Sequence, residues 1–380
     1  MKKTSYGRTS KQVTIVGFGG LRFDLDKSDE ELSYLVEYAY DRGINYFDTA
    51  PGYCDERSEA ILGIAFRRML KNNKKDFYVS TKGRPTVFDT ADKAIKGVRD
   101  SLIKLGVDKI HFYHIWCLRS MDNYDLAMKV GGQYEGLLKC QEEGLIDHIV
   151  FSSHQPGNQV QEILDADKFD GVTMGLNILN YNYRRESAEY AKAKGYGVVA
   201  MNPLSGGTIP DNEEKLSFIG KEGESATRGA LRFNLSCPNI DVTLIGFSNE
   251  REIDEACEIA ANLSTYDDDE YLDIQKQLGD RMEYICTGCG YCKLCPEGIN
   301  IPGYMLFYNE KVMFEKSDRE MVDMIYGLEY WNYTQNEVIR AGECIGCKKC
   351  ESECTQHLSI VDRLKEISDW EARGVDTVNV

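Results

Sequence analysis

The sequence predicts an α/β protein in which a closed (β/α)8 barrel of the TIM type is followed by a smaller, mainly helical domain. Short β-rich runs alternate eight times with amphipathic helical patterns between residues 12 and 261. Eight of the 13 cysteines then fall in two tight runs between Cys286 and Cys354. A chain of 380 residues is long enough for two or three domains of roughly 100 to 200 residues each.

The alternation is regular enough to assign each element of the barrel. The expected strands cover residues 13–18, 44–50, 77–82, 109–116, 148–153, 171–177, 196–202 and 242–247. The expected helices cover residues 29–43, 58–70, 91–106, 133–144, 158–166, 185–195, 225–236 and 250–263. Eight units over about 250 residues match a closed barrel, whereas an open doubly wound sheet usually has fewer strands. The run GFGGLR also fails as a dinucleotide-binding fingerprint, because Arg22 stands where the third glycine is needed.

The composition changes after Leu263, where residues 264–273 (STYDDDEYLD) are polar and acidic. We therefore expect the barrel to cover residues 1–263 and an acidic linker or helix to cover residues 264–280. The cysteine-rich domain then covers residues 281–380.

The charge balance restricts the classes of partner. The chain has 45 Lys and Arg against 62 Asp and Glu, a net charge of −17, which repels nucleic-acid phosphates and anionic lipids. The apolar run after the basic N-terminus is too short for a signal peptide, and no segment reaches the 18 or so apolar residues of a spanning helix. We expect a soluble cytoplasmic protein that acts on a small molecule and binds neither nucleic acid nor membrane.

Each cysteine run has the spacing of a loop that holds a metal cluster. The first run consists of Cys286, Cys289, Cys292 and Cys295, and the second of Cys344, Cys347, Cys350 and Cys354. Such spacing lets thiolates wrap around a cuboidal iron-sulfur cluster. Zinc is the main alternative, since it also takes four thiolates, but zinc ribbons use two Cys-x-x-Cys pairs far apart. Disulfides are a weaker alternative, because the cysteines are clustered and odd in number.

Reactive side chains in a barrel enzyme project from the carboxyl ends of the strands. The second expected strand ends in FDTAPGY, which places Asp48 and Tyr53 there. The third ends in STKG, which places Lys82 there. Each residue alone is ordinary, since most Asp-Lys pairs are structural ion pairs.

Together, these motifs resemble the aldo/keto reductase family. The matching features are GFGGLR near the start, FDTA with a tyrosine five residues after the aspartate, a lysine 29 residues later, and the late runs AMNPLSGG and ALRFNLSCPNIDVTLIGFS. More specifically, the chain resembles the branch of the family with a C-terminal ferredoxin-like domain that holds two [4Fe-4S] clusters. The resemblance covers almost the whole chain.

The resemblance implies hydride transfer between a nicotinamide and a carbonyl carbon, with a tyrosine that protonates the oxygen. Tyr53 matches this general acid, Lys82 the residue that tunes it, and Asp48 the group that keeps Lys82 charged and oriented. A phenol with a pKa near 10 is a weak acid at neutral pH, and a neighbouring ammonium favours its phenolate form.

The family's fourth catalytic residue, a histidine after strand four, is replaced here. It aligns with Trp116 in DKIHFYHIWCL, and an indole can donate one hydrogen bond but cannot accept one or titrate. His114 lies two residues earlier on the same face, roughly 7 Å deeper in the barrel. It either substitutes for the missing histidine through a shift in register or is a neutral core histidine. The replacement places ordinary aldehyde reduction in question.

The family's cofactor contacts carry over only in part. Ser152 and Ser153 match the pair that binds the nicotinamide carboxamide, and Asn177 takes the place of a strand-six glutamine. Further contacts are expected at Arg22, Gly246, Ser248 and Glu252. A carboxylate at Glu252 repels a 2′-phosphate, so NADH is favoured over NADPH. Because a nicotinamide delivers two electrons and each cluster accepts one, FMN in the barrel mouth is an alternative.

The ferredoxin resemblance implies ligand sets that cross between the runs, because the fourth cysteine of each run binds the other run's cluster. The first cluster would use Cys286, Cys289, Cys292 and Cys354, and the second Cys344, Cys347, Cys350 and Cys295. Thr355 stands where a proline is usual.

The chain is therefore interpreted as an aldo/keto-reductase-like oxidoreductase that interconverts a carbonyl and an alcohol. Its two [4Fe-4S] clusters would exchange electrons with a ferredoxin or flavodoxin-type partner. Two alternatives stay open. One is a flavin- and ferredoxin-dependent reductase that uses no nicotinamide hydride, and the other is a noncatalytic redox-sensing or electron-transfer protein on the same fold.

Overall fold

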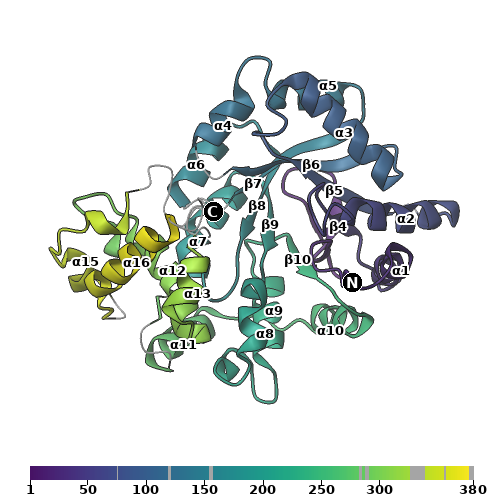
Figure 1. Ribbon diagram of the computed structural model, residues 1–380. Coiled ribbons are helices and arrows are strands. Elements are labelled where there is room, and N and C mark those ends of the chain that lie inside the picture. The colour runs from purple at the N-terminus through teal and green to yellow at the C-terminus, as the bar shows by residue number, and fades with distance from the viewer. Residues whose placement is uncertain are drawn as a thin grey trace.

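A closed parallel barrel forms the larger part of the computed structural model (Figure 1). The structure describes residues 1–74, 76–118, 121–153, 157–281, 285–286, 291–325, 339–354 and 357–375. The barrel strands are β3 (Val16–Gly19), β4 (Tyr46–Asp48), β5 (Tyr78–Gly83), β6 (Ile110–Leu118), β7 (Ile146–Ser153), β8 (Gly171–Gly175), β9 (Gly197–Met201) and β10 (Val242–Gly246). Each strand pairs with the next along the chain, and β10 closes the barrel against β3. The predicted (β/α)8 barrel is confirmed.

Helices form an outer layer around the strands (Figure 1). They are α1 (Asp29–Asp41), α2 (Ser58–Lys71), α3 (Ala91–Leu105), α5 (Gln133–Glu142), α6 (Gly157–Asp165), α7 (Tyr181–Ala193), α9 (Ala226–Ser236) and α10 (Glu250–Ala261). Several begin where a short polar side chain accepts a backbone N–H of the first turn, as Ser28, Thr90 and Ser225 do. The loops also hold elements that the sequence did not predict: α4 (Met121–Met128), η1 (Ser205–Gly207), α8 (Thr208–Asp211) and η2 (Ser217–Ile219).

The single strand expected over residues 13–18 is wrong, because the chain divides there. Its first part, β2 (Gln12–Thr14), pairs antiparallel with β1 (Lys3–Ser5), and only β3 enters the barrel. The backbone N–H of Thr14 donates to the side chain of Asn45 at 2.8 Å, and the Thr14 hydroxyl donates to the carbonyl of Val16 at 2.7 Å. These bonds hold the chain where it passes from the hairpin into the barrel.

The N-terminal hairpin covers the end of the barrel at which the strands begin. Tyr6 is fully buried, and its ring centroid lies 4.2 Å from that of Phe112 and 6.3 Å from that of Tyr46. Gly197 is required beside it, since a Cβ there would lie 2.1 Å from the Tyr6 ring. Aromatic rings therefore fill this end of the barrel, and the reactive side chains lie at the carboxyl end of the strands.

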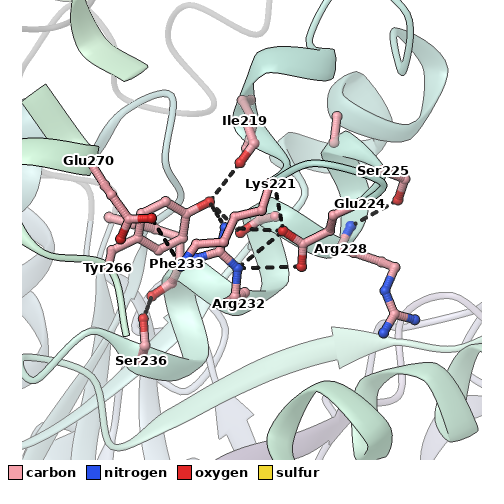
Figure 2. Close-up of polar contacts among 12 residues, drawn as sticks. Ile219, Lys221, Glu224, Ser225, Arg228, Arg232, Phe233, Ser236, Tyr266 and Glu270 are labelled. Carbon is pink, nitrogen blue, oxygen red and sulfur yellow. Dashed lines mark hydrogen bonds and ion pairs between the residues drawn. The ribbon is translucent and has the colours of Figure 1, made fainter. Parts of the chain in front are cut away.

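The acidic segment after Leu263 packs on the barrel without a break. Arg232 of α9 donates to Glu224 at 3.0 Å and to the Tyr266 hydroxyl at 2.9 Å, and that hydroxyl donates to the carbonyl of Ile219 at 2.6 Å (Figure 2). The next helix, α11 (Asp268–Arg281), buries Tyr271 among the barrel helices. The segment expected as a linker or helix is thus a packed helix over most of its length.

The C-terminal elements gather at one side of the barrel (Figure 1). They are η3 (Tyr291–Lys293), α12 (Ile301–Phe314), α13 (Asp318–Asp323), η4 (Ala341–Glu343), α15 (Lys349–Ser352) and α16 (Ile360–Val375). They share a second apolar core around Tyr304 and Trp370, both fully buried. Met313 at the end of α12 joins the barrel core, and Lys215 pairs with Glu315 at 2.8 Å. In the part of the chain that the structure describes, no helix is long and apolar enough to cross a bilayer.

His111 on β6 should limit the stability of the barrel in acid. Its Nδ1 accepts the backbone N–H of Val79 at 3.0 Å, and burial lowers the pKa of His111 to about 4. An unfolded histidine titrates near 6.5, so only the unfolded chain takes up this proton as the pH falls from about 6.5 to about 4. The free energy of unfolding should therefore fall across this window, by up to about 3 kcal/mol.

Urea unfolding at a series of pH values checks this expectation. His111→Asn is the matched variant, because its side-chain oxygen can accept a hydrogen bond but does not titrate. Stability should fall more steeply between pH 6.5 and 4 in the original chain than in the variant. Parallel curves would contradict the assignment.

Candidate active site

A buried ion pair lies at the carboxyl ends of β4 and β5. Lys82 Nζ pairs with Asp48 Oδ1 and also donates to the backbone carbonyl of Thr49 at 2.8 Å. Only 2% of Lys82 and 3% of Asp48 is exposed. Burial lowers the pKa of Lys82, and the charge and hydrogen bond of Asp48 oppose this. The carboxylate therefore both orients the amine and favours its charged form.

Ser80 and His114 extend this hydrogen-bonded group toward the amino ends of β5 and β6. The Ser80 hydroxyl donates to the second oxygen of Asp48 at 2.7 Å and lies 3.1 Å from Nε2 of His114. Because that hydroxyl donates to Asp48, Nε2 is the donor in the second bond. Burial, aided by the Lys82 charge, holds the pKa of His114 well below its ordinary value. This is the environment of a neutral core histidine.

Tyr53 packs against the amine of Lys82. Its ring centroid is 5.0 Å from Lys82 Nζ, and its ring is partly exposed. The next three residues, Cys54 to Glu56, all have positive φ angles of 54°, 53° and 65°. Such backbone is unfavourable for side chains other than glycine and occurs where surrounding contacts enforce it. The loop thus holds Tyr53 in a fixed position above Lys82.

Trp116 packs edge-on against Tyr53, at 5.5 Å between ring centroids and an angle of 86°. It stands where the register of β6 shifts between Ile115 and Leu118, and such an irregularity re-aims side chains at a strand end. The guanidinium carbon of Arg84 lies 4.2 Å from the centroid of the Trp116 ring. An indole ring with the Arg84 guanidinium over its face therefore occupies the position at which a histidine was expected.

Ser80 and Arg84 were not among the expected site residues. Both belong to the run SerThrLysGlyArg, in which residues 80, 82 and 84 alternate along β5 and its extension. Side chains at every second position of a strand share one face. The alternation around Lys82 is the sequence signal that identifies them.

The residues expected to bind the nicotinamide make hydrogen bonds to backbone groups at the ends of the strands. Ser152 accepts the backbone N–H of Cys117 at 2.8 Å, and Ser153 donates to the carbonyl of Leu118 at 2.8 Å. Asn177 is buried and donates to a backbone carbonyl of the loop after β9 at 3.0 Å. The two serines therefore stabilise the irregular end of β6 that carries the tryptophan.

The residues expected at the phosphate end lie together beside β3 and β10. Arg22 donates to the carbonyl of Gly206 at 2.9 Å, and its backbone carbonyl accepts the hydroxyl of Ser248 at 3.5 Å. Gly246 lets Arg22 cross the end of β10, since a Cβ there would lie 2.5 Å from the Arg22 side chain. Glu252 accepts the backbone N–H of Ser248 at 2.8 Å in the first turn of α10. Its carboxylate thus occupies a helix N-terminus at which a phosphate could otherwise bind.

Seven of the eight expected cluster cysteines are described, and Cys289 lies outside the described residues. The described cysteines form no disulfide. Cys286, Cys292 and Cys350 are buried in the second core, whereas Cys347 is exposed. Among the residues described, no three His, Cys, Asp or Glu side chains are arranged to hold a metal ion.

Comparison with known proteins identifies the barrel. Residues 15–278 match the aldo/keto reductase family. The chain belongs to this family. The expected aldo/keto reductase assignment is confirmed over the barrel, whereas the match ends before both cysteine runs. The ferredoxin-like character of the C-terminal part therefore stays a prediction.

Individual relatives of this aldo/keto reductase are oxidoreductases. L-galactose dehydrogenase of Arabidopsis thaliana is 26% identical over 276 residues, which cover 66% of this chain and 85% of that protein. D-threo-aldose 1-dehydrogenase of a Pseudomonas species is 26% identical over 248 residues, or 57% of this chain and 74% of that protein. The solved holo form of aldo-keto reductase AKR11C1 from Bacillus halodurans has a TM-score of 0.60 at 21% identity, covering 73% of this chain and 96% of that chain. The protein is an aldo/keto-reductase-like oxidoreductase, a class that typically uses NAD(P)H.

Proposed function

We propose that this aldo/keto reductase interconverts a small carbonyl compound and its alcohol at Tyr53, and that it exchanges electrons with a ferredoxin or flavodoxin-type protein through two [4Fe-4S] clusters. The observation that carries the catalytic part is the buried Lys82–Asp48 pair directly beneath the Tyr53 ring. A phenol held over a fixed ammonium is suited to donate a proton to a carbonyl oxygen.

Each residue of this group has a separate part in moving the proton. The Tyr53 hydroxyl donates to the substrate oxygen, and the nearby Lys82 charge stabilises the phenolate that remains. Asp48 and the carbonyl of Thr49 fix the amine, while Ser80 holds the other oxygen of Asp48. A bound nicotinamide would supply the hydride.

The residues beside β3 and β10 fit a dinucleotide that lacks a 2′-phosphate. Arg22 would bind the phosphates, while Ser152, Ser153 and Asn177 lie at the strand ends where the nicotinamide would bind. Glu252 places a negative charge at the start of α10. A second negative charge there is unfavourable, which supports NADH over NADPH.

The cysteine spacing of the C-terminal part, rather than an assembled group of ligands, supports the proposed iron-sulfur clusters. The second apolar core contains Cys286, Cys292 and Cys350, with the other described cysteines of both runs packed against it except exposed Cys347. The two runs also meet in space, since η3 of the first contacts α15 of the second. Cysteine thiolates are the ligands that [4Fe-4S] clusters use, and the described cysteines are not consumed by disulfides. Clusters supplied by both runs would lie on the side of the barrel that carries α12 to α16.

Anaerobic purification followed by metal, flavin and activity measurements tests the proposal. The protein should carry about eight irons and reduce members of a carbonyl panel with NADH. A yellow chromophore that remains after iron removal would instead support the flavin-dependent alternative. Binding of NADH without turnover of any carbonyl would support the noncatalytic redox alternative.

Trp116→His should raise the reduction of simple aldehydes by NADH. An imidazole at this position can donate to the carbonyl oxygen and can also accept or carry a proton, which an indole cannot. We expect an increase in kcat/KM of about tenfold, within the range of a single positioned acid–base group. Trp116→Phe is the matched control, because it keeps an aromatic surface beneath Arg84 and adds no acid. An unchanged or lower rate in the histidine variant would show that Trp116 does not occupy the histidine's position.

A further inference from the structure

His114 is a fully buried histidine on β6, on the same face of the strand as Trp116. Its Nε2 lies 3.1 Å from the hydroxyl oxygen of Ser80. Its Nδ1 is buried and has no hydrogen-bond partner among the residues that the structure describes. Burial of a polar ring is unfavourable unless its hydrogen bonds compensate, so the single contact with Ser80 requires an explanation.

The arrangement around Ser80 fixes the tautomer of His114. The Ser80 hydroxyl has one hydrogen, which it donates to Asp48 Oδ2 at 2.7 Å because a carboxylate can only accept. The oxygen of Ser80 therefore accepts the proton on Nε2 of His114. The other tautomer would bury an N–H at Nδ1 without an acceptor and would leave two acceptors competing for one hydrogen. The neutral Nε2–H form is thus the one that the site favours.

This chain of donors ends at the buried ion pair. Asp48 uses one oxygen for Lys82 and the other for Ser80, so both oxygens of the carboxylate are bonded. Each of the four residues in the chain, from His114 to Lys82, is no more than 3% exposed. Water therefore has little access to replace a missing donor, and each hydrogen bond is stronger than it would be at the surface.

The charge of Lys82 depends on the groups that surround its amine. Burial lowers the pKa of Lys82, the charge and hydrogen bond of Asp48 oppose this, and Glu59 on α2 opposes it less. Tyr53 packs against the amine from the loop after β4. His114 on β6 is held neutral by burial and so adds no charge. Asp48 is therefore the group through which a neighbour can most strongly alter the charge of Lys82.

We propose that His114 is a positioning residue that acts on the active site through Ser80. By donating to the Ser80 oxygen, it directs the hydrogen of Ser80 to Asp48. Asp48 then keeps Lys82 charged and fixed beside the phenol of Tyr53. This inference rests on the proposed function, since the charge of Lys82 affects the reaction only if Tyr53 is the proton donor. Unlike a histidine at the position of the indole, His114 contacts no substrate and transfers no proton.

Steady-state kinetics of carbonyl reduction from about pH 6 to about pH 10 tests this inference. His114→Leu removes the donor and keeps an apolar side chain in the barrel. We expect kcat at neutral pH to fall about fivefold to tenfold with little change in KM, the effect of one lost hydrogen bond. The alkaline limb of the profile should shift to lower pH, because Lys82 loses its proton more easily beside a less well held Asp48. His114→Gln, which keeps an N–H donor and cannot titrate, should restore most of both.

A double-mutant cycle separates action through Ser80 from a general effect on packing. Ser80→Ala should lower kcat by itself, and His114→Leu should add little in that background because the chain is already broken. His111→Asn is the control, since His111 lies on the same strand but bonds to the backbone of Val79, and it should leave the pH profile unchanged. Additive losses in the double variant, or equal losses in the leucine and glutamine variants, would overturn the role of His114.

Nitrogen-15 NMR of the full chain gives a second measurement that needs no turnover. The ring of His114 should be neutral and protonated on Nε2 at neutral pH. The amine of Lys82, assigned with Lys82→Met, should lose its proton at lower pH in His114→Leu, or in Ser80→Ala if the leucine variant does not fold. A proton on Nδ1, or a Lys82 titration that these variants do not shift, would overturn the positioning role. Failure to reduce any carbonyl would instead overturn the proposed reaction, and the titration would still decide whether His114 acts on Lys82.

Discussion

Tyr53→Phe should lower NADH-driven carbonyl reduction by about 10² to 10⁴, the range over which a positioned general acid acts. The variant removes one oxygen and keeps the ring that packs against Trp116 and lies 5.0 Å from the Lys82 amine. The fold and the binding of NADH should therefore be preserved, while the proton donor is lost. Steady-state kinetics with the best substrate of the carbonyl panel gives the effect on kcat, and fluorescence titration gives the affinity for NADH.

Tyr34→Phe is the control for this change. Tyr34 lies on the outer surface of α1, 56% exposed, with Arg68 over its ring, so loss of its hydroxyl should not alter turnover. If Tyr53→Phe retained most of the original kcat, the proton would have to come from another group. The fixed Lys82–Asp48 pair would then be a structural ion pair, as most such pairs are.

Cysteine variants should separate crossed ligation from ligation within each run. In the crossed arrangement, Cys295 and Cys344 bind the same cluster, so Cys295→Ser combined with Cys344→Ser should leave about four of the eight irons. Cys286→Ser combined with Cys295→Ser removes a ligand from each cluster and should leave almost none. Ligation within each run predicts the reverse order. Anaerobic iron analysis of the two double variants therefore decides between the arrangements.

Cys257→Ser is the control for the cysteine series, because this thiol lies on α10 of the barrel and belongs to neither run. It should keep the full iron content. The crossed arrangement is what the ferredoxin resemblance implies, and η3 in the first run contacts α15 in the second. Equal iron loss in both double variants would contradict both arrangements.

The barrel could be predicted because its signals are local and repeated. Strands β5 and β7 lie within a residue or two of their expected ranges, since each is a short β-rich run bounded by turn residues. The error over residues 13–18 has a different cause. An apolar run does not show whether its residues enter the barrel or a hairpin, and the contact between Thr14 and Asn45 that divides it joins residues 31 positions apart.

The candidate site could be predicted as a set of positions but not as a geometry. The motif around Asp48, Tyr53 and Lys82 identified strand ends, and a closed parallel barrel brings such ends together. It could not show that Ser80 holds Asp48, or that Arg84 covers Trp116, because these contacts depend on side-chain direction and on the irregular end of β6. For the acidic segment after Leu263, composition left a linker and a helix as alternatives, and only the structure shows a helix with Tyr271 buried against the barrel.

The amino-acid sequence is enough to identify the order of strands and helices, the aldo/keto reductase family and the spacing of the two cysteine runs. These properties depend on residues close together in the chain, because they follow from side-chain periodicity and motif spacing. Only packing buries His114, where the pKa of its imidazole is held well below the ordinary value, and brings Trp116 into contact with both Tyr53 and Arg84. Burial and electrostatic environment arise from residues distant in the chain, so they exist only once the barrel and the C-terminal helices have packed.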